Sequence, residues 1–316
     1  MKIKILDKGS MGDDLNFDVL RDFGEVEIYD RTEESLLEER ISDAEVIIIN
    51  KIKITKELLK TAKALKLICV FATGYDNVDL ESAKKQGVAV CNVPAYSTDS
   101  VVLYTVATVL SLAARLNEYT DFVKSGEYRI TGLPNRITPV FHEIKGKTWG
   151  IVGYGNIGRA VGEVARALGA NVIVNKRTPT DDVECVDIDT LCKRSDIITL
   201  HTPLNDATRN LIDKNRLALM KQSVILVNEA RGAVVSEADV ADAVTNGMIG
   251  AFGCDVYSKE PFGSDHPYMK IIDFPNVILT PHSAWGALEA RERCLKIIHD
   301  NINAFIEGKF LNRVDI

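Results

Sequence analysis

Short apolar runs alternate with amphipathic segments along almost the whole chain, and this rhythm most constrains the fold. Strands that are separated by helical crossovers pair in parallel and are covered by their helices. A first series of strands is expected at residues 2–6, 26–30, 45–49, 65–71 and 88–93. A second series is expected at residues 148–152, 171–175, 196–200, 224–228, 250–256 and 277–280. The sequence therefore predicts an α/β protein with two parallel sheets.

The pattern changes between the two series. Residues 98–124 predict one long, mostly apolar helix with Ser and Asp near its start as natural N-caps. Residues 125–145 are irregular and rich in Gly, Pro, Arg and Thr, and a loop of that length is usually functional or lies at an interface. A last helix is expected at residues 287–306.

Composition excludes several classes of protein. A chain of 316 residues predicts about two domains. A net charge of −7 argues against a nucleic-acid or anionic-membrane partner. No window reaches the roughly 18 uninterrupted apolar residues of a membrane span, and the N-terminus lacks the features of a secretion signal. Six scattered cysteines form no CxxC pair, so no metal site is expected and a cytoplasmic location with reduced thiols is favoured.

A glycine-rich turn follows the strand at residues 148–152. It reads Gly153, Tyr154, Gly155, Asn156, Ile157 and Gly158 and leads into a helix expected at 159–168. A GxGxxG motif between a strand and a helix predicts dinucleotide binding. Gly153 permits the turn, Gly155 lets a pyrophosphate approach the backbone, and Gly158 lets the helix pack close to the strand.

The next strand predicts which nicotinamide cofactor binds. An acidic residue normally follows such a turn by about 20 residues and accepts hydrogen bonds from the ribose. Lys176 stands there instead, followed by Arg177 and Thr178. Two cations and a hydroxyl favour the 2′-phosphate of NADP(H). The alternative is that they form a solvated strand end and NAD(H) binds.

Three later strands each lead into a polar side chain that can act in catalysis. These side chains are Arg231, Glu260 and His282. The carboxyl ends of parallel strands converge on the ligand crevice, so we expect the three groups to meet there. A guanidinium can bind a carboxylate and a carbonyl, a histidine can move a proton, and a glutamate can pair with that histidine. Taken singly, each also fits a structural role in a turn or cap.

The order of these segments and the residues in them resemble the D-isomer-specific 2-hydroxyacid dehydrogenase family over essentially the whole chain. Residues 228–232 are similar to its arginine segment, 254–261 to its glutamate segment, 280–282 to its histidine segment and 72–79 to its substrate-binding turn. Residues 92–96 and 282–285 most resemble the glycerate dehydrogenase or hydroxypyruvate reductase branch. Leu103 and Tyr104 depart from the family, which commonly has polar residues there.

The resemblance implies two Rossmann-like domains: a discontinuous, flavodoxin-like substrate domain (1–96 plus 287–316) and a dinucleotide-binding domain (97–286). It also implies a homodimer with residues 125–145 at the interface. The implied site residues are Asn156 and Ile157 over the pyrophosphate; Thr202, Pro203 and Thr208 beside the adenosine; Glu229, Ala230 and Asp255 beside the nicotinamide; and the amides of Thr73 and Gly74 on the substrate carboxylate.

The implied reaction is reduction of a small 2-keto acid to a D-2-hydroxy acid with NAD(P)H. Arg231 would bind the carboxylate and polarise the carbonyl, and His282 would donate a proton while Glu260 favours its protonated form. Two alternatives stay open: a D-lactate-type dehydrogenase that uses pyruvate or larger keto acids, and a cofactor-sensing co-repressor or scaffold. A pure sensor does not need an acid/base pair, which favours the enzyme.

Overall fold

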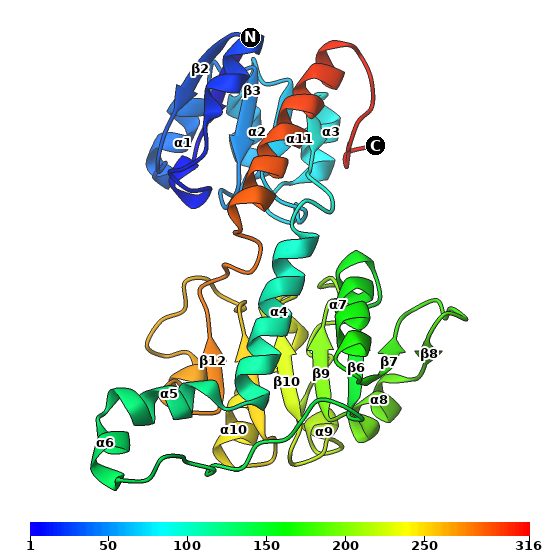
Figure 1. The fold of residues 1–316 in the computed structure, drawn as a ribbon. Helices are drawn as coiled ribbons and strands as arrows, with labels where there is room; N and C mark the ends of the chain where they lie inside the picture. Colours follow the sequence, from blue (N-terminus) through cyan, green and yellow to red (C-terminus); the bar gives the residue numbers. More distant parts are fainter. The chain divides into compact units, whose positions relative to one another are not determined.

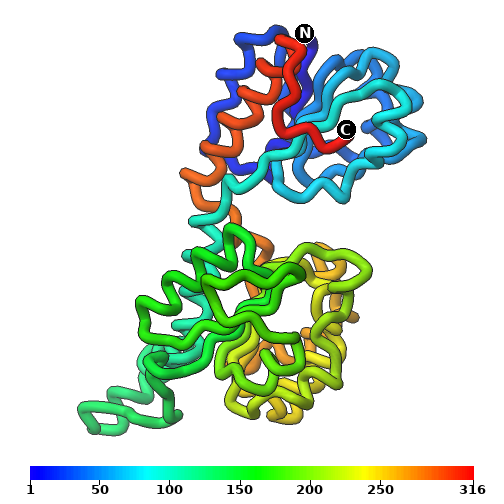
Figure 2. Tube along the Cα trace, turned by 90° about the vertical axis from the view of Figure 1, so that its right-hand side faces the viewer, coloured from blue at the N-terminus to red at the C-terminus, as the bar shows by residue number.

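The computed structural model describes residues 1–316, which form two compact units. The first unit comprises Met1–Ser97 and Gly286–Ile316, and the second comprises Thr98–Trp285 (Figure 1). Both chain ends therefore lie in the first unit (Figure 2). Each unit contains one parallel sheet with helices packed on it, so the predicted α/β class with two parallel sheets is confirmed.

The first unit contains a five-stranded sheet in the order β2-β1-β3-β4-β5. Its strands are β1 (Lys2–Ile5), β2 (Glu25–Ile28), β3 (Val46–Ile49), β4 (Leu67–Val70) and β5 (Ala89–Cys91). Its helices are η1 (Lys8–Ser10), η2 (Phe17–Phe23), α1 (Glu34–Ile41), α2 (Lys56–Thr61), α3 (Leu80–Gln86) and α11 (Leu288–Ile306). All four residues of β3 and of β4 are buried, because helices cover both faces of the sheet.

The second unit contains a seven-stranded sheet in the order β12-β11-β10-β9-β6-β7-β8. Its strands are β6 (Thr148–Val152), β7 (Asn171–Asn175), β8 (Glu184–Cys185), β9 (Ile197–Leu200), β10 (Ile225–Asn228), β11 (Ala251–Cys254) and β12 (Val277–Leu279). The two-residue strand β8 was not predicted. All pairings are parallel, so the strands share one carboxyl edge.

Helices cover both faces of the second sheet. The helices of this unit are α4 (Thr98–Ala113), α5 (Leu116–Lys124), α6 (Glu127–Thr131), α7 (Asn156–Ala167), α8 (Ile188–Arg194), α9 (Lys214–Leu217), α10 (Glu237–Thr245), and the short η3 (Gly232–Val234) and η4 (Pro267–Lys270). Side chains of α4 and α7 share one hydrophobic core with Trp149 and Val227, and those of α8, α9 and α10 share another with Leu226 and Phe252.

The prediction of a single long helix at residues 98–124 is wrong. The chain instead forms α4 and α5, which are bent by 66° at the break between them. Arg115 adopts a left-handed conformation there, with φ 54°, and its guanidinium pairs with Glu118 at 2.6 Å. A left-handed residue cannot continue a right-handed helix, so the helix ends. No single helix is both long and apolar enough to cross a membrane, although α4 and α5 together pass the same test of length and composition.

Residues 116–142, here called the arm, extend from the body of the second unit (Figures 1 and 2). The stretch predicted to be irregular, residues 125–145, contains the short helix α6. The arm carries large exposed apolar side chains: Leu116, Val123, Tyr128, Ile130, Leu133, Ile137, Val140 and Phe141. A run of apolar side chains of this size on a surface is typical of an interaction site.

Candidate active site

The glycine-rich turn joins β6 to α7, which begins at Asn156, three residues earlier than expected. Gly153 has φ +88°, and an added Cβ would meet the carbonyl oxygen of His201 at 2.5 Å. A Cβ on Gly158 would meet the carbonyl oxygen of Gly153 at 2.1 Å. These two glycines are therefore required by close backbone contacts.

Gly155 differs from both neighbouring glycines. A Cβ there would meet nothing within 4 Å, so the space above the turn is open. Gly155 is the N-cap of α7, no side chain caps the helix, and its first turn carries no acidic residue. Unpaired amides and the positive end of the helix dipole thus face open space, which fits a dinucleotide pyrophosphate. Tyr154 is buried, and its hydroxyl accepts a hydrogen bond from Arg166 at 3.1 Å.

The strand β7 ends at Asn175, and the predicted ribose-side residues follow it. Lys176 is half-buried, whereas Arg177 and Thr178 are exposed. Neither cation forms an ion pair, although Asp182 lies nearby in sequence; Asp182 instead pairs with Arg159 at 2.5 Å. Two cations are therefore available at the carboxyl end of the strand next to β6.

The predicted adenosine-side residues lie in the loop after β9. Thr208 donates a hydrogen bond to the carbonyl of Pro203 at 2.6 Å and accepts one from the amide of Asn205 at 2.8 Å, so the loop is held by its own contacts. Thr202 follows His201, whose Nε2 atom is buried without a hydrogen-bond partner. Burial lowers the pKa of His201 to about 3, so this imidazole is neutral.

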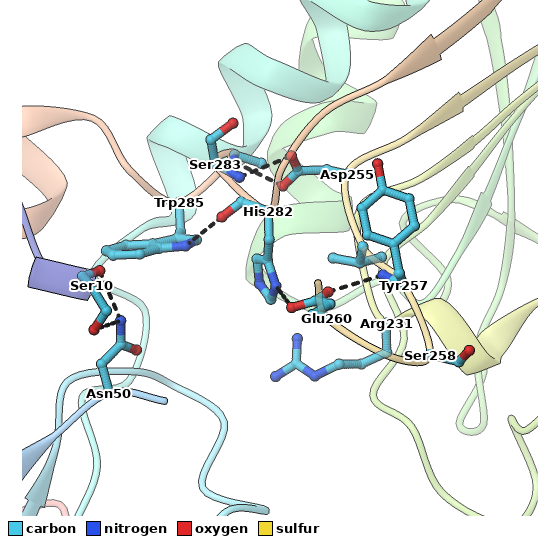
Figure 3. A network of polar contacts seen from close by, with 12 residues as sticks. Ser10, Asn50, Arg231, Asp255, Tyr257, Ser258, Glu260, His282, Ser283 and Trp285 are labelled. Carbon is cyan, nitrogen blue, oxygen red and sulfur yellow. Dashed lines mark hydrogen bonds and ion pairs between the residues drawn. The ribbon is translucent and has the colours of Figure 1, made fainter. Parts of the chain in front are cut away.

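Glu260 and His282 are in direct contact. His282 Nδ1 lies 2.6 Å from Glu260 Oε2, and Glu260 Oε1 accepts a hydrogen bond from the amide of Tyr257 at 2.9 Å (Figure 3). His282 has φ 53°, a conformation that costs a non-glycine residue about 1–3 kcal/mol. A strained backbone that presents an imidazole to a carboxylate is typical of a functional site.

Asp255 braces the loop that carries His282. Its Oδ1 accepts a hydrogen bond from the amide of Ser283 at 2.9 Å (Figure 3). The hydroxyl of Thr280 donates to the same oxygen at 2.6 Å, and the amide of Ala284 donates to Oδ2 at 2.9 Å. The indole of Trp285 donates to the carbonyl of His282 at 2.9 Å. These bonds compensate for the strain at His282.

Arg231 begins the turn after β10. Asn228, the last residue of that strand, is fully buried; its side chain accepts from the amide of Ala230 at 3.1 Å and donates to the carbonyl of Arg231 at 3.0 Å. A Cβ on Gly232 would lie 2.0 Å from the carbonyl carbon of Tyr257, so this turn packs directly on the loop that leads to Glu260. The Arg231 side chain is extended beside the Glu260–His282 pair in Figure 3.

Glu229 lies between the end of β10 and α4. Its Oε2 accepts a hydrogen bond from Thr105 at 2.5 Å, and its Oε1 accepts one from Thr108 at 3.2 Å. Burial, with a smaller contribution from Asp255, raises the pKa of Glu229 to about 8. Thr105 and Thr108 were not predicted as site residues, although their two hydroxyls lie on one face of α4.

Thr73 and Gly74 belong to the first unit and follow β4. The Thr73 hydroxyl donates a hydrogen bond to the carbonyl of Val93 at 2.8 Å, and the backbone carbonyl of Thr73 accepts one from the side chain of Asn92 at 2.8 Å.

Leu103 and Tyr104, the two residues that depart from the family, lie on α4 of the second unit. The hydroxyl of Tyr104 is hydrogen-bonded to that of Ser283 at 2.9 Å, whereas the side chain of Leu103 is exposed. Tyr104 thus contacts the loop of His282.

The family model described as "D-isomer specific 2-hydroxyacid dehydrogenase, NAD binding domain" matches residues 106–284. A hydroxypyruvate reductase from Blautia hydrogenotrophica is 34% identical, with 100% of both chains covered. A glycerate dehydrogenase from Methylorubrum extorquens is 38% identical, with 88% of this chain and 87% of the relative covered. The solved structure of an acyclic imino acid reductase (Bsp5) with NADPH and D-Arg matches with a TM-score of 0.88 and 30% identity, covering 99% of this chain and 100% of the other. The chain is an NAD(P)-binding oxidoreductase and belongs to the D-isomer-specific 2-hydroxyacid dehydrogenase family.

Proposed function

We propose that this enzyme reduces a small 2-keto acid, of the hydroxypyruvate or glyoxylate type, to its D-2-hydroxy acid. The observation that carries the proposal is the contact of His282 Nδ1 with Glu260 Oε2 at 2.6 Å. Glu260 orients the ring through this contact, so that the opposite nitrogen, Nε2, can donate a proton. When bound, the reduced nicotinamide supplies the hydride.

The other residues bind and orient the substrate in this proposal. Arg231 offers a planar pair of donors to the carboxylate and the carbonyl oxygen, and it polarises that carbonyl. His282 then donates its proton to the carbonyl oxygen as the keto carbon gains the hydride, and in the reverse direction it accepts that proton.

NADP(H) is the cofactor that the charges favour. Lys176 and Arg177 have no acidic partner in the protein and stand where a carboxylate would otherwise repel a 2′-phosphate. Charge-assisted hydrogen bonds contribute about 1.5–3 kcal/mol each, which corresponds to a preference of roughly tenfold or more. The remaining proposed cofactor contacts are the α7 amides for the pyrophosphate; Thr202, Pro203 and Thr208 for the adenosine; and Glu229, Ala230 and Asp255 for the nicotinamide.

A homodimer formed through the arm is part of this proposal. Ile130 and Ile137 are 79% and 77% exposed, and burying such side chains stabilises an interface. Ile130→Glu combined with Ile137→Glu should convert a dimer to a monomer in analytical ultracentrifugation. Wild-type protein that sediments as a monomer would refute the dimer.

A cytoplasmic location is also part of the proposal. It agrees with six free cysteines, of which five are buried.

The test is a matrix of substrates and cofactors. Hydroxypyruvate, glyoxylate and pyruvate are each assayed with NADPH and with NADH, by loss of the reduced-nicotinamide absorbance and by chiral analysis of the product. A D-hydroxy acid with the highest kcat/KM for hydroxypyruvate or glyoxylate is expected. Preference for pyruvate indicates a D-lactate-type enzyme, and cofactor binding without turnover indicates a sensor. Repeating the assay with an added amine tests imino acids, since one similar structure is an imino acid reductase.

A further inference from the structure

Glu229 is a carboxyl group without a cation to pair with. It follows directly after β10 and faces α4, where its two hydrogen-bond donors are the hydroxyls of Thr105 and Thr108. Thr105 is fully buried and Thr108 is 7% exposed. Two neutral hydroxyls stabilise a buried carboxylate far less than a guanidinium or an ammonium does. The local structure therefore favours the neutral acid.

The neighbouring strands add no positive charge. Asn228 pairs in register with Cys254 of β11, so Asp255 stands beside Glu229 at the carboxyl edge. Burial holds the pKa of the Cys254 thiol well above its usual range, which leaves it neutral. On the other side, β9 leads into His201, which is neutral because burial lowers its pKa. Glu229 thus has two hydroxyls and the carboxyl group of Asp255 beside it, and the flanking strands end in a neutral thiol and a neutral imidazole.

We propose that Glu229 is a proton-linked sensor of the cofactor's oxidation state, which keeps its proton beside reduced nicotinamide and releases it when the oxidised, cationic ring binds. The inference rests on the proposed function, in which the nicotinamide lies at the carboxyl edge near β10 and β11. A positive charge placed next to a buried acid favours its ionised form. The reduced ring carries no such charge and leaves Glu229 neutral.

The pKa supports this geometry. Burial raises the pKa of Glu229 to about 8, so Glu229 is mostly protonated at neutral pH and has a proton to release. A binding step that releases one proton strengthens by about tenfold per pH unit below that pKa. The affinity for NAD(P)⁺ should therefore rise between about pH 6 and 8, whereas the affinity for NAD(P)H should not. At lower pH the oxidised product would leave more readily.

Calorimetric titration of the whole protein with NAD(P)⁺ and with NAD(P)H, in buffers of different ionisation enthalpy, counts the protons. We expect release of close to one proton with the oxidised cofactor near neutral pH and none with the reduced one. Equal proton release for both forms would overturn the proposal. This comparison uses wild-type protein alone, so it does not depend on any variant folding.

Variants then assign the proton to one residue. Glu229→Gln keeps the shape of the side chain without the ionisation, and it should abolish the release and the pH dependence of the Kd for NAD(P)⁺. Persisting release in Glu229→Gln would assign the proton elsewhere, and His282→Gln tests the other titratable group. Glu184→Gln is the matched control, because Glu184 is exposed in the same unit and pairs with Arg194.

The two proposals fail separately. Wild-type turnover of keto acids without a difference in proton release would sink only the role of Glu229. Proton release that depends on Glu229, without turnover of any keto acid, would sink only the substrate assignment.

Discussion

The carboxyl edges of the two sheets end in similar βα turns but use their polar groups differently. In the first unit, Asp7 follows β1 and accepts the amides of Asn50 and Lys51 at 3.0 and 2.6 Å, and the Asn77 side chain donates to the carbonyl of Ile52 at 2.8 Å. These groups hold neighbouring backbone. In the second unit, by contrast, Glu260 contacts the side chain of His282.

The difference shows that chemistry requires, besides the βα fold, polar side chains that contact one another and do not only hold the backbone. Asp7 stabilises turns, and burial raises its pKa. Asp255 of the second unit also holds backbone amides, yet the loop it holds presents His282. Support and chemistry are thus divided between adjacent residues. Substitutions in matched positions of the two units can test this division.

The largest expected effect is at histidine. His282→Gln removes the proton donor, and kcat should fall by about 10²- to 10⁴-fold while the Kd for NAD(P)H changes little. His299→Gln is the control in the first unit, where His299 packs on Phe23 with ring centroids 4.6 Å apart. It should leave kcat unchanged. Similar kcat values for the two variants would remove His282 from the chemistry.

Arginine should show the next largest effect. Arg231→Lys replaces a planar pair of donors by a single ammonium, and kcat/KM for the keto acid should fall by roughly ten- to a hundredfold. Arg313→Lys is the counterpart in the first unit, where Arg313 pairs with Asp315 through Nε at 2.7 Å. It should lower the Tm and leave kcat/KM unchanged. Equal losses of kcat/KM would erase the contrast between the units.

A smaller effect is expected for cofactor choice. Lys176→Glu places a carboxylate beside the proposed 2′-phosphate, and the ratio of kcat/KM for NADPH over NADH should fall by about tenfold. Lys193→Glu, an exposed change on α8 of the same unit, makes the same change in net charge. A shift of equal size in that control would show that overall charge, rather than the end of β7, sets the preference.

Local signals predicted every strand except β8, and they predicted the glycine turn. β3 and β4 were recognisable because both faces are buried, which requires consecutive apolar residues. The requirement for Gly158 arises from contacts five residues away, within reach of a motif. The break at Arg115 was missed because no Gly or Pro marks this left-handed residue. One such backbone angle redirected the second half of a predicted helix.

Several polar contacts between segments that are far apart in the chain could not be predicted from the sequence. Thr105 and Glu229 are 124 residues apart, and Asp255 and Ala284 are 29 residues apart. Neither pair follows from periodicity, because each depends on how helices and loops pack on the strand ends. The strand ends themselves were predictable, so Glu260 and His282 could be expected to meet. The roles assigned to them and to Arg231 stay predictions that the substitutions above test.

The last contrast between the two units is in how their stability changes with pH. Glu229 has a pKa raised from 4.5 to about 8, so the folded state keeps a proton that the unfolded chain loses. Stability from this group is complete below about pH 4.5 and is lost as pH rises toward 8, with a slope of at most about 1.4 kcal/mol per pH unit. Both tryptophans, Trp149 and Trp285, lie in the second unit, so their fluorescence reports its unfolding.

Urea unfolding followed by this fluorescence should give a free energy that falls with pH in the wild type. In Glu229→Gln the part of the slope due to Glu229 disappears, because the amide does not titrate. Asp7→Asn removes a buried acid from the first unit, and it should leave the fluorescence-detected slope as in the wild type. An unchanged slope in Glu229→Gln would mean that the pKa of Glu229 in the folded state is the ordinary one. Glu229 would then be ionised at neutral pH.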